Sequence, residues 1–114
     1  MKEMILQTKV LVCSYGELTE TDREVVDAAR AATANSYAIY SHFNVGAAVR
    51  LNNGIIVSGT NQENAAYPSG ICAERTPLFW ANSQYPNESV ETLAIAARTE
   101  QGELEAPIPP CGAC

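Results

Sequence analysis

The sequence has no long apolar run, few basic residues and a single histidine, and each shortage excludes a class of protein. No apolar run approaches the ~18 residues of a transmembrane helix, so we expect no membrane span. Seven lysine and arginine residues stand against thirteen acidic ones, which gives a formal net charge of −6 and no basic stripe. Binding a polynucleotide requires basic residues that replace counterions along the phosphates. We therefore predict no nucleic-acid partner, and we expect a related ligand to be small and uncharged, such as a free nucleoside.

The beginning of the chain also lacks the features of an export signal. Met1 to Val12 contains two lysines but neither a long apolar centre nor a small-residue cleavage site. We therefore expect a cytoplasmic protein whose four cysteines are reduced thiols or metal ligands and not disulfides. Cys13 is far from the other cysteines, and we expect it to be a small, half-buried side chain. Residues 1–18 are predicted to form an N-terminal arm or an extra strand.

Residues 19–114 suit one compact domain. Thr21 to Glu24 has the form of a helix capping box, and apolar residues recur after it at helical spacing, which predicts a helix over about 22–37. Val45 to Leu51 and Ile55 to Ser58 predict two antiparallel strands. The Asn-Gly pair between them supplies the positive φ angles of a tight hairpin turn.

A second helix is predicted to open at Cys72 and run to about Ser83, with Pro77 in the first turn, where its missing N–H is tolerated. Val90 to Arg98 predicts a strand that is buried on both faces. After an acidic, proline-rich connection, a third helix is expected to begin at Cys111. The order helix, hairpin, helix, strand predicts an α/β domain layered around one sheet.

Three cysteines form a pattern suited to one metal ion. Cys72 is followed two residues later by Glu74, and Cys111 and Cys114 form a Pro-Cys-x-x-Cys motif. A structural zinc site usually has four protein ligands, whereas a catalytic site keeps three and leaves the fourth position to water. A ligand-x-Glu motif followed by Pro-Cys-x-x-Cys is the known arrangement of zinc deaminases. We therefore predict a catalytic Zn²⁺ held by Cys72, Cys111 and Cys114.

Two other interpretations fit the Cys-x-x-Cys pair by itself: a redox pair, or half of a closed structural zinc site. The distant Cys72-x-Glu74 argues against the redox pair. The closed site lacks a fourth ligand, because Cys13 and His42 are the only spare thiol and imidazole. We expect His42 to be exposed and to have no catalytic role.

Glu74 is the predicted proton carrier. In the hydrolytic removal of an amino group from a ring, one carboxyl group can take a proton from water and pass it on. The alternative is that Glu74 only favours the helix dipole. Three thiolates on Zn²⁺ leave a formal charge of −1, and we expect Arg75 to balance it. The alternative for Arg75 is an ordinary position on the helix surface.

The chain resembles the cytidine and deoxycytidylate deaminase family, and within it the small, homotetrameric branch of cytidine deaminases with all-cysteine zinc ligands. The likeness covers about residues 22–114. Its motifs are YSHFNVGAA at 40–48, NQENAAY at 61–67, CAERT at 72–76 and PCGAC at 110–114. It implies a three-layer α-β-α domain with a mixed central sheet. Family members continue beyond the position of Cys114, so we expect a fragment that lacks the C-terminal part of the fold.

The resemblance also implies roles for individual residues. Cys72, Cys111 and Cys114 match the zinc ligands, Glu74 the proton shuttle, and Arg75 a residue that pairs with the thiolates. Asn61 and Glu63 match a pair that binds the ribose hydroxyls, Phe43 an aromatic that packs against the pyrimidine, and Ala73 a backbone contact to the base.

The residue types agree with these roles but leave alternatives open. Asn61 and Glu63, two apart on an extended loop, point the same way and can bind a vicinal diol. They could instead be loop residues that cap the next helix. Phe43 could be an ordinary core residue.

The activity we expect is the hydrolytic deamination of cytidine and 2′-deoxycytidine to uridine and 2′-deoxyuridine, with release of ammonia, in pyrimidine salvage. The intact protein is expected to be a homotetramer. One alternative is a deaminase of another aminopyrimidine nucleoside, such as a nucleoside antibiotic. The other is a catalytically silent fragment that binds zinc or a nucleoside.

Overall fold

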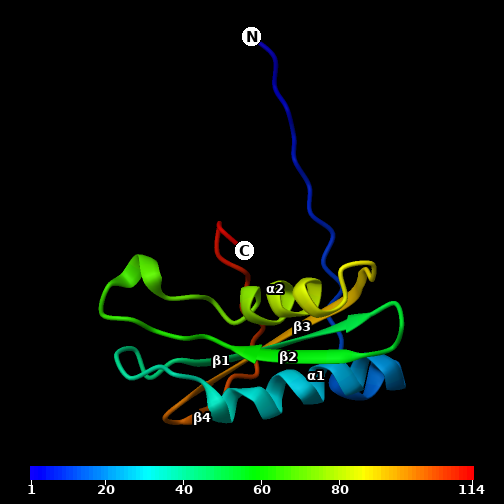
Figure 1. The fold of residues 1–114 in the computed structure, drawn as a ribbon. Coiled ribbons are helices and arrows are strands. Elements are labelled where there is room, and N and C mark those ends of the chain that lie inside the picture. The colour runs from blue at the N-terminus through cyan, green and yellow to red at the C-terminus, as the bar shows by residue number, and fades with distance from the viewer.

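The computed structural model describes residues 1–114, and its central feature is a four-stranded sheet between two helices (Figure 1). Helix α1 lies on one face of the sheet and helix α2 on the other. The predicted three-layer α-β-α arrangement is therefore confirmed. The elements are α1 (Glu20–Ala32), β1 (Asn44–Leu51), β2 (Ile56–Thr60), α2 (Arg75–Gln84), β3 (Val90–Thr99) and β4 (Gly102–Glu103), with short 3-10 turns at Tyr15–Glu17, Thr33–Asn35 and Tyr67–Ser69.

The strands lie in the order β2-β1-β3-β4, and every neighbouring pair is antiparallel. The prediction of a mixed sheet is therefore not met by these strands. The chain passes from β2 through α2 to β3, and these two strands run in the same direction because each is antiparallel to β1. They do not pair with each other, since β1 lies between them.

Helix α1 begins two residues before the predicted start. Its N-cap is Thr19, whose hydroxyl accepts a hydrogen bond from the backbone N–H of Asp22 at 3.2 Å. The predicted capping box at Thr21 is wrong: Thr19 is extended, as an N-cap must be, and Thr21 already lies within the helix. The α-helix ends at Ala32 and continues only as a 3-10 turn to Asn35, which accounts for most of the predicted range.

Alternation along β1 places the core on both faces of the sheet. Val25 and Ala29 of α1 pack against Ala48 on one face. On the other face, one cluster joins Val49 and Leu51 to Ala81 of α2, and a second contains Val45, Ala47, Ala73 and Ala97. Successive residues of a strand point to opposite faces, so a central strand between two helices is apolar along its whole length. Residues 45–49 are all buried.

The hairpin between β1 and β2 is confirmed, but its turn differs from the prediction. Gly54 has a φ of 88°, whereas no positive φ occurs at Asn53. The backbone N–H of Gly54 donates to the Leu51 carbonyl at 2.9 Å, and that of Leu51 donates to Ile55 at 2.9 Å. A three-residue loop needs a left-handed residue only at its last position, and glycine takes that position here.

The second half of the domain departs from prediction at three places. Helix α2 begins at Arg75, so Cys72 lies in the turn before it, while Pro77 is in the first turn as predicted. Strand β3 is not buried on both faces, because only Ala97 in it is buried. The predicted helix at Cys111 is not observed, since residues 111–114 form neither helix nor strand.

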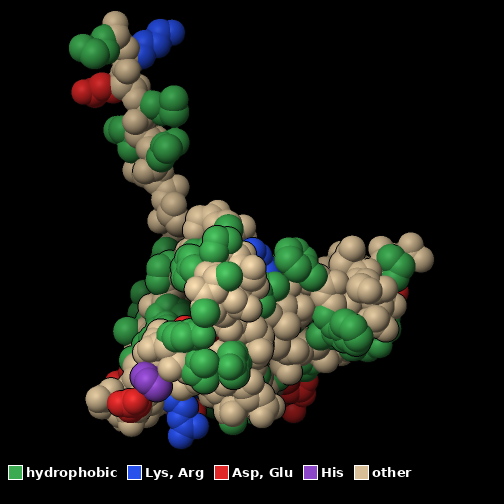
Figure 2. Space-filling view, turned by 60° about the vertical axis from the view of Figure 1, so that its left-hand side comes forward, with side chains coloured by type: hydrophobic (Ala, Val, Ile, Leu, Met, Phe, Trp, Pro, Cys, Tyr) green, Lys and Arg blue, Asp and Glu red, His purple; other side chains and the backbone are tan.

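The first fourteen residues have neither helix nor strand and extend away from the domain (Figure 2). Of the two predicted alternatives, an extra strand is not formed. Cys13 is exposed and not half-buried as expected, because nothing packs over this segment. No helix of the structure has the length and apolar character needed to cross a bilayer.

Gly46 brings α1 against the sheet, and its replacement by alanine is expected to be strongly destabilising. A Cβ at this position would lie 2.1 Å from the Ala29 carbonyl oxygen and 2.8 Å from the Thr33 nitrogen. Both are backbone atoms, so the helix itself must shift. We expect a loss of about 3 kcal/mol in the free energy of unfolding, measured by urea denaturation. Gly16→Ala is the control, since its Cβ would meet no atom within 4 Å; equal stability of the two variants would contradict this account.

Candidate active site

Cys72 is held beside the end of β2 by a short stretch of strand pairing. Gln62 and Ile71 exchange two backbone hydrogen bonds, each of 3.0 Å. The next residue is Cys72, whose carbonyl accepts a hydrogen bond from the N–H of Arg75 at 3.2 Å. Ala73 is buried in the cluster that also contains Val45. The cysteine therefore lies at a backbone turn fixed on one side by the sheet core and on the other by α2.

The second pair of cysteines returns to the same place from the end of the chain. Ile108 packs against the cluster that holds Ala73, which anchors the segment before Cys111. The Cys72 and Cys111 sulfurs are 3.6 Å apart, and those of Cys111 and Cys114 are 3.4 Å apart. All three sulfurs lie within 4.8 Å of one another. The structure thus brings together the three cysteines that the sequence predicts as ligands, and leaves Cys13 out.

These separations fit a common metal ion. Zn–S bonds of about 2.3 Å in a tetrahedron place the sulfurs about 3.8 Å apart. A disulfide would require about 2.05 Å, and all four cysteines are free thiols. Three thiols of this spacing, with no fourth protein ligand among them, can hold a soft divalent cation and leave one coordination position open.

The charges around the cluster point to the same conclusion. A hydrogen bond from the Cys114 backbone, and then the Cys114 and Cys72 thiols, lower the pKa of the Cys111 thiol to about 7. The pKa of Cys114 is raised to about 12, first by partial desolvation of its thiol and then by the nearby Cys111 and Glu74 side chains. Thiolates this close repel one another, so a bound cation would stabilise all three in their anionic form.

Glu74 and Arg75 border the cluster. Glu74 is 7% exposed and lies close enough to Cys114 to affect the pKa of that thiol. The sulfurs of Cys72 and Cys114 lie beside the Arg75 guanidinium group and raise its pKa. Its buried Nε atom has no hydrogen-bond partner within the protein. A carboxyl group and a cationic side chain therefore lie at the edge of the sulfur triangle.

Asn61 is bonded mainly to its own protein. Its Oδ1 atom accepts hydrogen bonds from the Ser36 hydroxyl at 2.6 Å and the Val45 N–H at 2.9 Å. Its Nδ2 atom donates to the Phe43 carbonyl at 2.9 Å. An asparagine side chain offers two acceptor and two donor positions, so one N–H donor is left.

Glu63 is bonded in the same way to the loop before β1. Its Oε1 atom accepts from the N–H groups of Tyr40 at 2.9 Å and Ser41 at 3.1 Å, and its Oε2 atom accepts from the Ser41 hydroxyl. The Ser41 hydroxyl is the main cause of the lowered pKa of Glu63. A carboxylate has about four acceptor positions, so about one is left.

Phe43 joins this loop to the cluster. Its ring is half-buried and packs against the group that contains Val45 and Ala73. One side of the Phe43 ring therefore packs in the core, which was the alternative role left open for this residue. The side-chain partners of Asn61 and Glu63, Ser36 and Ser41, were missed in the sequence. Ser41 lies in the YSHFNVGAA motif, which was a signal for it, whereas Ser36 lies four residues before the motif.

Comparison with known proteins agrees with this geometry. The family model described as "Cytidine and deoxycytidylate deaminase zinc-binding region" matches residues 19–114. The chain belongs to this family.

The relatives in this deaminase family include a cytidine deaminase of Halalkalibacterium halodurans, 44% identical over 69% of this chain and 55% of its own length. That of Sporosarcina psychrophila is 41% identical over 80% of this chain and 62% of its own length. The crystal structure of cytidine deaminase from Burkholderia pseudomallei superposes with a TM-score of 0.71 at 41% identity, covering 85% of this chain and 72% of that one. The chain thus spans little more than half the length of the curated relatives.

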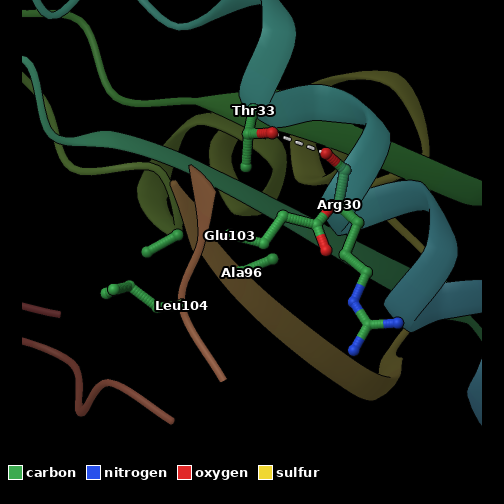
Figure 3. A pocket seen from close by; sticks show the side chains of 6 residues that line it. Arg30, Thr33, Ala96, Glu103 and Leu104 are labelled. Carbon is green, nitrogen blue, oxygen red and sulfur yellow. Dashed lines mark hydrogen bonds between the residues drawn. The ribbon is translucent and has the colours of Figure 1, made fainter. Parts of the chain in front are cut away.

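Two cavities of this deaminase-family domain lie away from the cysteines. One, of about 10 Å³, lies between the end of α1, β3 and β4 and has room for about one water molecule (Figure 3). An open groove of about 570 Å³ runs between β2 and the exposed Phe79 and Trp80 of α2. None of the three clustered cysteines lines either. His42 is exposed, as expected, and its Nδ1 atom lies 3.8 Å from Oε1 of Glu100.

The lowered pKa of Glu63 predicts a pH-dependent contribution to stability. A carboxyl group whose pKa falls on folding stabilises the protein above its unfolded pKa, and this contribution is lost as the pH falls through the folded pKa. The reference pKa here is 4.5. When the pH is lowered from neutral to below 4.5, the free energy of unfolding of Glu63→Gln should therefore fall by less than that of the unchanged protein. Urea denaturation at the two pH values measures the difference. Glu91→Gln, the same substitution at the exposed start of β3, is the control. An equal change of pH dependence in the two variants would contradict this account.

Proposed function

We propose that the protein is a zinc-dependent enzyme that hydrolyses cytidine and 2′-deoxycytidine to uridine and 2′-deoxyuridine with release of ammonia. The observation that carries the proposal is the convergence of the Cys72, Cys111 and Cys114 sulfurs with the Glu74 side chain at their edge. The relatives that bear the name cytidine deaminase support the choice of substrate. A homotetrameric assembly and a cytoplasmic location stay predictions.

The three thiolates would hold the zinc ion, which when bound supplies a Lewis acid that acidifies water. Glu74 then does the proton transfers. Its carboxylate takes a proton from the attacking water and passes it to N3 of the pyrimidine, and a second transfer lets the amino group leave as ammonia. The burial of Glu74 keeps the exchange from bulk water. Arg75 offsets the negative charge of the thiolates.

The remaining residues would bind the nucleoside. Phe43 offers an aromatic surface to the pyrimidine. It packs against the core cluster that contains Ala73, whose backbone would contact the base. Asn61 and Glu63 have one free donor and about one free acceptor between them. That capacity suits a single sugar hydroxyl, which accepts one hydrogen bond and donates another.

The test is a substrate panel with the purified protein. Cytidine, 2′-deoxycytidine, free cytosine and other aminopyrimidine nucleosides are compared by ammonia release, and zinc is measured by elemental analysis. We expect cytidine and 2′-deoxycytidine to be turned over at comparable efficiency and free cytosine to be a much poorer substrate. Preference for another nucleoside would favour the alternative deaminase. Bound zinc with no turnover of any member would overturn the proposal of catalysis.

A further inference from the structure

Ser41 connects two parts of the candidate site that are otherwise separate in the chain. Its hydroxyl donates to Oε2 of Glu63. The hydroxyl oxygen of Ser41 also accepts a hydrogen bond from the N–H of Phe43 at 3.1 Å. Its backbone N–H donates to Oε1 of Glu63 at 3.1 Å. One residue thus holds both carboxylate oxygens of Glu63 and the backbone that carries Phe43.

The backbone between Ser41 and Phe43 requires this support. His42 has a φ of 55°, and it is the only residue other than glycine with a positive φ. The bond from the Phe43 N–H to the Ser41 hydroxyl closes a side-chain turn around His42, and the His42 N–H donates to Ala38 at 2.9 Å. The left-handed region is unfavourable for a residue with a Cβ, so the conformation persists because these bonds hold it.

The position of Glu63 depends on the same hydroxyl. All three groups that bond its carboxylate come from Tyr40 and Ser41, and two of the three belong to Ser41. The side-chain bond alone orients Oε2, because both backbone donors reach Oε1. Hydrogen bonds to an ionised group are stronger than those between neutral groups. Without the Ser41 hydroxyl, Oε2 would lose its only protein donor, and only the two N–H bonds to Oε1 would restrain rotation of the carboxylate about the terminal bond of the side chain.

We propose that Ser41 is a positioning residue for nucleoside binding: its hydroxyl sets the direction in which Glu63 presents its free acceptor to the sugar, and at the same time sets the Phe43 backbone on the side of the base. This inference rests on the proposed function. It assigns Ser41 no contact with the substrate and no part in the proton transfers.

The test compares Ser41→Ala with Ser41→Thr and with Ser89→Ala. Ser41 is exposed, so threonine can keep the hydroxyl with its methyl group in solvent. Ser89 is also exposed, and its hydroxyl has no hydrogen-bond partner within the protein. We measure uridine binding by calorimetry, and KM and kcat for cytidine. Ser41→Ala should weaken uridine binding and raise KM about five- to tenfold, with kcat changed less than about twofold. Ser41→Thr and Ser89→Ala should match the unchanged protein.

A double-mutant cycle with Glu63→Ala separates positioning from a general loss of structure. If Ser41 acts chiefly through Glu63, adding Ser41→Ala to Glu63→Ala should weaken uridine binding by clearly less than the same change does alone. Full additivity, or unchanged binding by Ser41→Ala, would overturn the inference while leaving the proposed function intact. Failure of the unchanged protein to bind uridine or turn over cytidine would overturn both.

Discussion

Glu74→Gln is expected to reduce the turnover of cytidine on the order of 10³-fold, because glutamine keeps the size of the side chain but cannot accept and return a proton. Glu74 is nearly fully buried beside Cys114, so the amide can occupy the same space. Zinc content and uridine binding should stay close to those of the unchanged protein. Single-turnover ammonia release measures the loss, and elemental analysis measures the metal.

The matched control is Glu91→Gln, the same chemical change at an exposed position on β3. It should leave kcat and KM unchanged. Turnover by Glu74→Gln within about tenfold of the unchanged protein would remove Glu74 from the proton path, since general acid–base catalysis contributes at least about 10²-fold.

Cys72→Ser is expected to abolish both zinc retention and turnover. Of the clustered thiols, Cys72 is the one placed by the sheet and the start of α2, and its sulfur lies 3.6 Å from that of Cys111. A serine hydroxyl is a poor ligand for zinc at neutral pH, so two thiolates would have to hold the ion. We expect the zinc content to fall from near one per chain to near zero after dialysis against a mild chelator. The free energy of unfolding should fall with it, because bound metal stabilises the folded state.

Cys13→Ser makes the same substitution at the cysteine outside the cluster, which is exposed on the N-terminal segment. Zinc content, stability and turnover should all be unchanged. Equal zinc loss in both variants, or full retention in Cys72→Ser, would show that the three cysteines do not form the binding site.

Much of the domain could be predicted where the controlling interactions are local. The β1–β2 hairpin follows from two apolar runs around a glycine turn, and α1 follows from apolar residues at helical spacing. Even here the exact start of the helix depended on which of two neighbouring residues caps it. Thr19 and Thr21 both have side chains able to cap a helix, and the longer helix was formed. Strand β3 looked fully buried because its composition is apolar, but how well a strand is covered depends on elements far away in the sequence.

The candidate site shows the same division. The Cys-x-Glu and Cys-x-x-Cys spacings indicated metal ligands and a proton carrier, since residues two or three apart are close in any backbone conformation. The loop partners of Asn61 and Glu63 could not be read in this way. Their hydrogen bonds to Ser36 and Ser41 join residues 25 and 22 positions apart, and many other serines and backbone groups in the chain could have made equivalent bonds.

By itself, the sequence determined which residues can bind a metal, which segments are apolar at strand or helix spacing, and that acidic residues outnumber basic ones. Only the tertiary structure decided that Cys72 meets Cys111 across 39 residues, and that Asn61 and Glu63 hydrogen-bond to the loop that carries Phe43. The physical reason is that local periodicity and spacing act within a few residues. Contacts between distant segments are selected by the packing of the whole sheet and its two helices.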